Sequence, residues 1–405
     1  MKVLQGTCRA ALFATALAMA SATANAQTQG TIKIGVLHSL SGTMAISETT
    51  LKDTILMMVD DLNKKGGLLG KKVEAVVVDP ASNWPLFAEK ARDLLANQKV
   101  AAVFGCWTSV SRKSVLPVFE ELNGLLFYPV QYEGEESSRN VFYTGAAPNQ
   151  QAIPAVQYLM GEEGGGAKRW VLEGTDYVYP RTTNKILEAF LKSKGVAADD
   201  IKINYTPFGY SDWQTEVAAI KQFAASGKKT AVVSTINGDA NVGFYKALAV
   251  QGITSDKIPV VAFSVGEEEL ASLDVTPLVG HLTAWNYFMS LEGPRNEAFI
   301  AQWHKHIKND LRVTNDPMEA TWIGFTMWTE AVKKAGTTDV DKVREAMKGL
   351  KVKAPSGIEV TMDPETQHLH KPVFIGEIKP DGQMQLVWQS EGPVAPVPWS
   401  PYIKK

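Results

Sequence analysis

Apolar residues along this chain follow two periodicities, one typical of buried strands and the other of amphipathic helices. From Thr31 onward, short β-rich runs predict strands, and the segments between them place apolar residues at helical spacing, as in Leu51, Ile55 and Met58. The first four predicted strands are residues 32–37, 73–79, 100–105 and 125–129.

The same alternation begins again after Pro148. Predicted helices near 150–161, 182–194, 212–225 and 241–250 alternate with predicted strands at 169–174, 201–208, 230–236 and 259–264. Continuous apolar strands separated by helices indicate parallel sheets that are covered on both faces. Two such runs in 405 residues predict two doubly wound α/β lobes. The C-terminal part adds predicted helices near 295–308, 317–335 and 340–349, and β-rich segments near 356–362 and 372–389.

The N-terminus is predicted to be a secretory signal peptide over residues 1–26. Lys2 and Arg9 form its basic region, residues 10–20 its apolar run, and Ala-Asn-Ala at 24–26 its cleavage pattern. The apolar run is too short to cross about 30 Å of hydrocarbon, which argues against a membrane anchor. We therefore expect an exported mature protein, which the family resemblance given below implies to be periplasmic.

The charge balance argues against a polyanionic partner. The formal net charge is −2, it becomes −4 when Lys2 and Arg9 leave with the signal peptide, and the remaining basic residues are scattered. Such a chain offers no long basic run for nucleic acid or anionic lipid, so we expect neither as a partner.

The sequence lacks the motifs of catalysis, metal binding and cofactor binding. There is no Gly-x-Ser-x-Gly, no His-Glu-x-x-His and no paired-cysteine spacing. His368 and His370 are interpreted as a solvated surface pair, because no cysteine or carboxylate cluster accompanies them. Cys106 is the one thiol left after cleavage, which excludes an internal disulfide, and it is interpreted as buried rather than nucleophilic. We therefore expect no enzyme, no metal and no cofactor.

Hydrogen-bonding and aromatic side chains follow the predicted strands instead. In doubly wound sheets, ligands bind beyond the carboxyl ends of the strands, in the crevice. Aromatic walls with a few convergent polar groups are typical of a pocket for a small molecule, although each single aromatic residue is as often ordinary core. The candidate ligand-binding residues are Trp84, Trp107, Thr108, Ser109, Tyr128, Gln131, Tyr177, Tyr179, Asn237, Asp239 and Glu267.

Long segments of the chain resemble the type 1 periplasmic binding proteins, and more closely the urea-binding proteins of bacterial urea ABC transporters. A related family is the amide-sensing receptor of aliphatic amidase operons, which is cytoplasmic and therefore lacks a signal peptide. The resemblance is carried by IKIGVLHSLSG (32–42), NKKGGLLGKKVE (63–74), FGCWTSVSRKSVLPVFE (104–120), LLFYPVQYEG (125–134), FYTGAAPNQQ (142–151), DYVYPRTTNKI (176–186), INGDANV (236–242), FSVGEEEL (263–270), AWNYF (284–288), DPMEA (316–320) and DPETQHLHK (363–371).

The resemblance implies a fold, a mechanism and a set of contacts. It implies two lobes joined by a three-strand hinge, the first formed by 31–147 plus 281–355 and the second by 148–280 plus 356–405. The lobes would close on the ligand, and an ABC permease would recognise the closed form. The implied ligand contacts are Ser109, Tyr128 and Tyr179, followed by Tyr177, Asp239 and Glu267.

Urea is the leading ligand because every role that it requires has a candidate. Hydroxyls such as that of Ser109 can donate to its oxygen, a carboxylate such as Asp239 can accept from its N–H groups, and a ring such as that of Trp107 can cover its flat face. Short amides such as acetamide satisfy nearly the same groups, and a branched or polar amino acid also remains open. Two further alternatives are a ligand-sensing receptor and, ranked last, an amide hydrolase.

Overall fold

The first lobe is built on a five-stranded parallel sheet. A computed structural model describes residues 30–403, so the predicted signal peptide lies outside the described residues. The strand order is β2-β1-β3-β4-β5. Its strands are β1 (Ile32–Leu37), β2 (Val73–Val78), β3 (Val103–Gly105), β4 (Leu126–Tyr128) and β5 (Val141–Tyr143), and its helices are α1 (Ala45–Lys64), α2 (Trp84–Arg92), α3 (Ser109–Glu121), α10 (Asp316–Ala335) and α11 (Val340–Met347).

The second lobe is built on a seven-stranded mixed sheet of order β15-β14-β10-β9-β8-β6-β7. The strands from β7 to β10 along this order are parallel, whereas β14 runs antiparallel to β10 and to β15. The strands are β6 (Arg169–Thr175), β7 (Ile201–Thr206), β8 (Thr230–Thr235), β9 (Val260–Ala262), β10 (Leu282–Trp285), β14 (Phe374–Ile378) and β15 (Met384–Gln389), and the helices are α4 (Ala152–Met160), α5 (Val178–Ser193), α6 (Trp213–Ala224), α7 (Ala240–Val250) and α8 (Glu267–Ala271).

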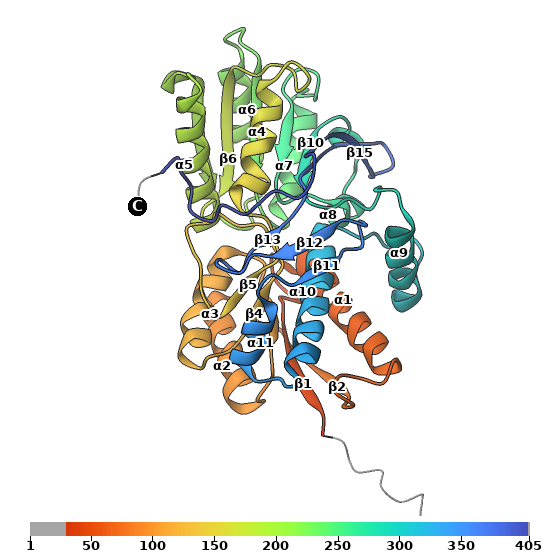
Figure 1. Cartoon of the computed structure of the whole chain (residues 1–405). Coiled ribbons are helices and arrows are strands. Elements are labelled where there is room, and N and C mark those ends of the chain that lie inside the picture. The colour runs from red at the N-terminus through yellow and green to blue at the C-terminus, as the bar shows by residue number, and fades with distance from the viewer. Residues whose placement is uncertain (1–29, 404–405) are drawn as a thin grey trace, which may run out of the picture.

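The two lobes meet across the middle of the molecule, with α3 lying against α5 and α1 against α8 (Figure 1). Further elements are α9 (Pro294–Ile307) and a small antiparallel sheet of β11 (Lys351–Lys353), β12 (Glu359–Met362) and β13 (Leu369–His370). This arrangement confirms the predicted α/β architecture of two doubly wound lobes.

Each lobe has its own hydrophobic core. Strand β8 is buried at every position, because helices cover both faces of its sheet. One core joins residues of β1–β5 with residues of α10 and α11, and two further clusters fill the second lobe on either side of its sheet. Exposed ion pairs such as Lys192 with Glu188 contribute at most about 1 kcal/mol each, so these cores supply most of the stability.

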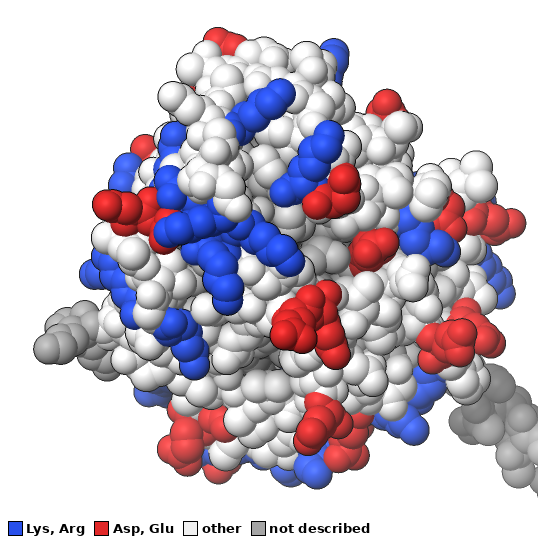
Figure 2. All heavy atoms as spheres, turned by 90° about the horizontal axis from the view of Figure 1, so that it is seen from above, with Lys and Arg blue, Asp and Glu red and all other residues white. Residues whose placement is uncertain are grey.

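The exposed surface carries both positively and negatively charged side chains. Figure 2, which looks down on the second lobe, shows Lys and Arg side chains gathered toward one side and Asp and Glu in separate smaller groups. Within residues 30–403, no helix is both long enough and apolar enough to span a membrane.

The lobes exchange chain at somewhat different residues from those predicted. The sequence placed residues from 281 in the first lobe, whereas β10 pairs with β9 and β14 in the second sheet. It placed residues from 356 in the second lobe, whereas Val360, Met362 and Leu369 pack in the first core. Both differences arise because the short β-rich segments near a hinge have the same apolar pattern whichever sheet they join.

The chain passes between the lobes three times, and one side chain ties the three passages together. Asn286, which follows β10, donates from Nδ2 to the carbonyl oxygens of Gln150 (3.0 Å) and Pro372 (2.6 Å). Its own backbone N–H donates to Asp316 Oδ2 at 2.8 Å, and the same oxygen lies 3.7 Å from the buried Lys371 Nζ. The three passages are therefore bound to one another at the hinge.

Candidate functional site

The carboxyl ends of both sheets face the interface between the lobes, and side chains bridge it directly. Gln131, from the loop after β4, donates from Nε2 to the Phe263 carbonyl oxygen (2.6 Å) and to Ser264 Oγ (2.9 Å) of the second lobe. Trp107 Nε1 donates to Asn237 Oδ1 at 3.4 Å. All five residues are buried, so the structure represents the two lobes closed on each other.

The turn between β3 and α3 brings Trp107 and Ser109 to this interface. Cys106 adopts φ +67°, a left-handed conformation that redirects the chain after β3. Thr108 Oγ1 then accepts from the Ser111 N–H and caps α3. This hydroxyl is therefore engaged by the helix rather than by the interface. Cys106 is fully buried, and burial raises the pKa of its thiol, which confirms the interpretation of a shielded cysteine.

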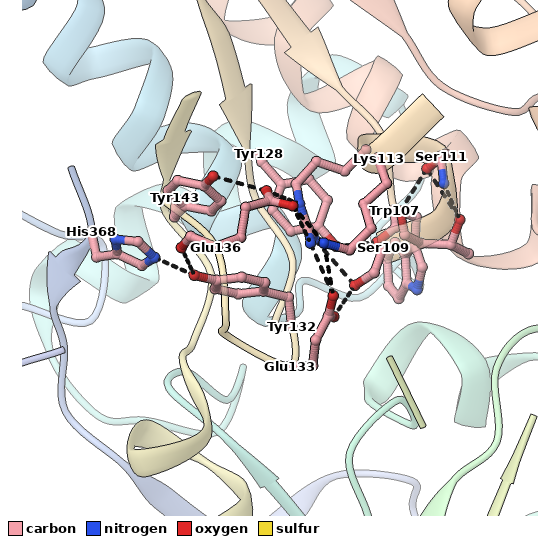
Figure 3. A network of polar contacts seen from close by, with 12 residues as sticks. Trp107, Ser109, Ser111, Lys113, Tyr128, Tyr132, Glu133, Glu136, Tyr143 and His368 are labelled. Atoms are coloured by element: carbon pink, nitrogen blue, oxygen red, sulfur yellow. Dashed lines mark hydrogen bonds and ion pairs between the residues drawn. The ribbon is translucent and has the colours of Figure 1, made fainter. Parts of the chain in front are cut away.

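Ser109 belongs to a buried ionic network (Figure 3). Its hydroxyl donates to Glu133 Oε2 and accepts from Arg112 Nη1 at 3.1 Å. The Arg112 guanidinium also contacts Glu133 Oε1 (3.2 Å) and Glu136 Oε1 (2.7 Å), and Lys113 Nζ lies 2.7 Å from Glu136 Oε2. Burial acts to raise the pKa of Glu136, but Arg112 and Lys113 outweigh it and lower this pKa to about 2.

Tyr128 is held in place by the same network. Its hydroxyl donates to the Trp107 carbonyl oxygen at 2.5 Å, and the Arg112 guanidinium lies 4.7 Å from its ring centroid. The predicted ligand contacts Ser109 and Tyr128 thus share Arg112 as a neighbour. Their geometry is fixed by buried partners rather than by solvent.

The expectation for His368 was wrong. This side chain is fully buried, its ring stacks on Tyr143 with centroids 4.2 Å apart, and its Nε2 is hydrogen-bonded to the Tyr132 hydroxyl at 2.5 Å. Burial lowers the pKa of His368 to about 4, so the ring is neutral at pH 7. Only His370, which lies 3.2 Å from Asp363, is partly exposed. Strand β13 begins at Leu369, so His368 lies before the strand, and the two histidines do not share a strand face as their spacing suggests.

The second lobe contributes an aromatic wall. Tyr177 and Tyr179, at the start of α5, are buried with ring centroids 6.1 Å apart. The ring of Phe208, from the loop after β7, lies 4.8 Å from Tyr177 and 5.3 Å from Trp84 of the first lobe. Trp84 is half-buried, so it borders the interface rather than lying within it.

Two buried polar atoms at the interface have no hydrogen-bond partner. The Tyr179 hydroxyl lies beside Gln131 and Ser264 but forms no hydrogen bond of acceptable geometry with either. Gln131 Oε1 is also unpaired, although Gln131 Nε2 is fully used. Burial raises the pKa of Tyr179, which keeps its hydroxyl a donor at pH 7. An unpaired donor and an unpaired acceptor therefore lie close together between the lobes.

The two carboxylates expected near the ligand lie apart from these residues. Asp239, at the start of α7, is exposed, and its backbone N–H points to the Thr43 carbonyl oxygen at 3.4 Å. Glu267 is buried and accepts from the Met289 N–H at 2.6 Å, beside the second passage between the lobes. The rule for strand ends located both residues at the correct edge but did not give the direction of their side chains.

Sequence reasoning missed two carboxylates at the interface, Glu133 and Glu269, and Glu269 Oε1 accepts from Ser47 Oγ of the first lobe at 2.6 Å. Glu133 lies only five residues after Tyr128, and it acts on Tyr177 and Tyr179 across the interface. Arg112 follows Ser109 by one helical turn, a spacing that places both on one face of α3. From that spacing, Arg112 could have been predicted as a neighbour of Ser109. Within residues 30–403, no three His, Cys, Asp or Glu side chains gather as metal ligands would.

Two lobes that close over an interface lined by aromatic and hydrogen-bonding groups define a solute-binding protein of the type 1 class rather than an enzyme. Residues 32–405 match the family described as periplasmic binding protein domain, so the chain belongs to the periplasmic binding proteins.

Curated relatives cover nearly the whole chain. The chain is 25% identical over 373 residues to Leu/Ile/Val-binding protein homolog 6 of Brucella melitensis, which covers 90% of this chain and 92% of that protein. It is 22% identical over 367 residues to the leucine-, isoleucine-, valine-, threonine- and alanine-binding protein of Pseudomonas aeruginosa, over 87% of this chain and 91% of that protein.

Solved structures show the same fold. A solute-binding protein of an ABC transporter from Rhodopseudomonas palustris, in complex with p-hydroxybenzoic acid, superposes with a TM-score of 0.78 at 22% identity. The match covers 91% of this chain and 99% of that one. A leucine-binding protein from Thermotoga maritima gives a TM-score of 0.74 at 18% identity, over 88% and 98% of the two chains.

Proposed function

We propose that this protein is a periplasmic receptor that captures urea between its lobes and delivers it to an ABC permease. The observation that carries the proposal is the unpaired pair at the interface, the Tyr179 hydroxyl and Gln131 Oε1. Each is buried, and leaving such a group without a partner costs about 1–3 kcal/mol. A ligand that accepts one hydrogen bond and donates another removes both costs.

Urea has this complementarity in a small planar molecule. Its oxygen accepts from a hydroxyl such as that of Tyr179, and its N–H groups donate to an oxygen such as Gln131 Oε1. The rings of Trp107 and Tyr177 are buried at the same interface and supply apolar faces that exclude water. Asn237 and Tyr128 hold Trp107 through its ring nitrogen and its carbonyl oxygen, which keeps the wall in place.

Closure couples capture to delivery. Gln131 bonds to Phe263 and Ser264 only when the lobes are together, so ligand that stabilises Gln131 in this position favours the closed state. The passages joined through Asn286 are the natural place for the bending. The signal peptide predicted from the sequence at residues 1–26 supports export to the periplasm, where a permease would meet the closed form.

An amino acid is the second candidate, because the named relatives at 22–25% identity are leucine-, isoleucine- and valine-binding proteins. Short amides such as formamide and acetamide fit the same donor and acceptor as urea. The same clamp also serves a sensing receptor, for which the partner would be a sensor protein in place of a permease. These candidates differ in ligand or partner and share the closure mechanism.

Calorimetry of the mature protein, residues 27–405, with urea, acetamide, formamide and leucine tests the proposal. We expect urea to bind, and Tyr179→Phe to weaken binding by about 3- to 10-fold, the equivalent of one net hydrogen bond. Tyr245→Phe is the matched control, since Tyr245 is equally buried in the second lobe, also has an unpaired hydroxyl, and packs on Phe244 and His281 within the second-lobe core. Tight binding of leucine without urea binding contradicts the proposal, as does an equal effect of the two substitutions.

A further inference from the structure

The Glu133 carboxylate occupies the end of α3 that faces the interface. It accepts from the hydroxyl of Ser109, the first residue of α3, and it lies 3.2 Å from Arg112 Nη2. Only 1% of Glu133 is exposed. The N-terminal end of a helix favours negative charge, and here a side chain of the protein itself supplies that charge.

Glu133 also acts on the tyrosines that line the proposed ligand position. Burial is the main cause that raises the pKa of Tyr128, Tyr177 and Tyr179, and the negative charge of Glu133 raises each pKa further. Two of these tyrosines belong to the second lobe, so the carboxylate is close to both walls of the interface. Glu136, by contrast, lies against Tyr143 and Lys113 on the other side of the network (Figure 3).

The buried network is balanced in charge without any ligand. Arg112 and Lys113 carry two positive charges, and Glu133 and Glu136 carry two negative charges. His368, which stacks at the edge of this network, has a pKa lowered to about 4 by burial and adds no charge at pH 7. A ligand carboxylate at this interface would bring one unpaired negative charge beside Glu133, whereas a neutral amide leaves the balance intact.

We propose that Glu133 determines ligand specificity, because its carboxylate occupies the position beside Ser109 and Arg112 that the carboxylate of a ligand would otherwise take. The site then accepts neutral ligands with N–H donors and rejects anions. This inference rests on the proposed function for the location of the ligand between the lobes. It goes beyond it in naming the residue that excludes carboxylic acids, a class that otherwise matches much of the same hydrogen bonding. Glu133 Oε atoms would in addition accept an N–H of a neutral ligand.

Acetamide and acetate form a matched pair of probes, because they share shape and differ by one charge. We measure both by calorimetry with wild type, Glu133→Gln and Glu136→Gln. Removing a charge next to the ligand is expected to raise acetate affinity at least about 10-fold in Glu133→Gln, since one unit charge within several ångströms is worth more than the 1.4 kcal/mol of a tenfold change. Glu136→Gln removes the same charge from the far side of Arg112, farther from the ligand, and we expect it to raise acetate affinity at least about 3-fold less than Glu133→Gln does.

Thermal unfolding provides a second readout that also works for a weakened variant. Bound ligand raises Tm, so acetate is expected to raise the Tm of Glu133→Gln more than the Tm of Glu136→Gln and to leave the Tm of wild type unchanged. An acetate affinity and a Tm response in Glu133→Gln equal to those of wild type overturn the inference, and so does an equal gain in both variants. Urea binding by wild type is a separate measurement, so its absence refutes the proposed function while the acetate comparison still decides the role of Glu133.

Discussion

Replacing Arg112 with Met tests whether the buried network supports the site as the geometry indicates. The guanidinium is fully buried between two carboxylates, 2.7 Å from Glu136 Oε1 and 3.2 Å from Glu133 Oε1. Met has a similar length and fills the space of the aliphatic part, but it leaves both carboxylates without their main partner. Breaking a buried ion pair on one side typically costs about 3–5 kcal/mol, because the remaining charge stays buried.

We expect Arg112→Met to lower the free energy of unfolding by about 3–5 kcal/mol. Guanidinium chloride is the denaturant, because urea is the proposed ligand, and tryptophan fluorescence follows unfolding. The double variant Arg112→Met/Glu136→Gln should lose at least about 1 kcal/mol less than the sum of the single losses, because the second change removes one stranded charge. Arg92→Met is the control, since Arg92 pairs with Glu121 at the surface, where such a pair is worth about 0–1 kcal/mol.

Equal losses for Arg112→Met and Arg92→Met would refute this reasoning. Strict additivity in the double variant would also refute it, since it would mean that Arg112 and Glu136 act independently despite the 2.7 Å between them.

Two further predictions concern the hinge and the pH dependence of stability. Asn286→Ala leaves the carbonyl oxygens of Gln150 and Pro372 without their donor. We expect it to lower the free energy of unfolding in guanidinium chloride by about 2–4 kcal/mol. A loss below about 0.5 kcal/mol would show that solvent replaces both hydrogen bonds. Burial raises the pKa of Glu267 from its ordinary value of 4.5 to about 8. Its contribution to stability is therefore complete below about pH 4.5 and is lost as the pH rises through about 8. The fall in Tm between pH 5 and 9 should therefore be smaller in Glu267→Gln than in wild type, and parallel Tm curves for the two proteins would contradict this assignment.

Most of the fold was predictable because its determinants are local. Alternating strand and helix patterns located β1, β2, β6 and β8 within a residue or two, since each strand contains a run of apolar or β-branched residues. Strand β5 was missed, because Val141–Tyr143 is too short to show a periodicity. The sheet assignment of β10 was not predictable either, because it depends on which lobe the chain enters after the strand.

The candidate site was predictable in its location and less so in its chemistry. The rule for strand ends selected Trp107, Gln131 and Tyr179, which do meet at the interface. It treated all strand-end carboxylates alike, although Asp239 faces solvent and Glu267 accepts from a backbone N–H at the hinge. Side-chain direction at the first turn of a helix depends on what packs against that turn, and the sequence of the helix does not contain this information.

The selection between neutral and anionic ligands depends on a quantity that no single segment of the sequence contains. The formal charge of the whole chain is −2. The charge that acts on a ligand at the interface is instead the net charge of the buried network, whose side chains come from residues 109–113, residues 133–136 and His368, and only the fold brings these together. If Glu133 were absent, the same serine, arginine and tyrosines would form a good carboxylate site, because Arg112 would keep a free direction beside Ser109. On the proposed role of Glu133, one acidic residue in the loop after β4 sets the charge of the ligand that the site accepts. A fold shared with a protein solved with p-hydroxybenzoic acid and with a leucine-binding protein would then serve a neutral solute without a change in its architecture.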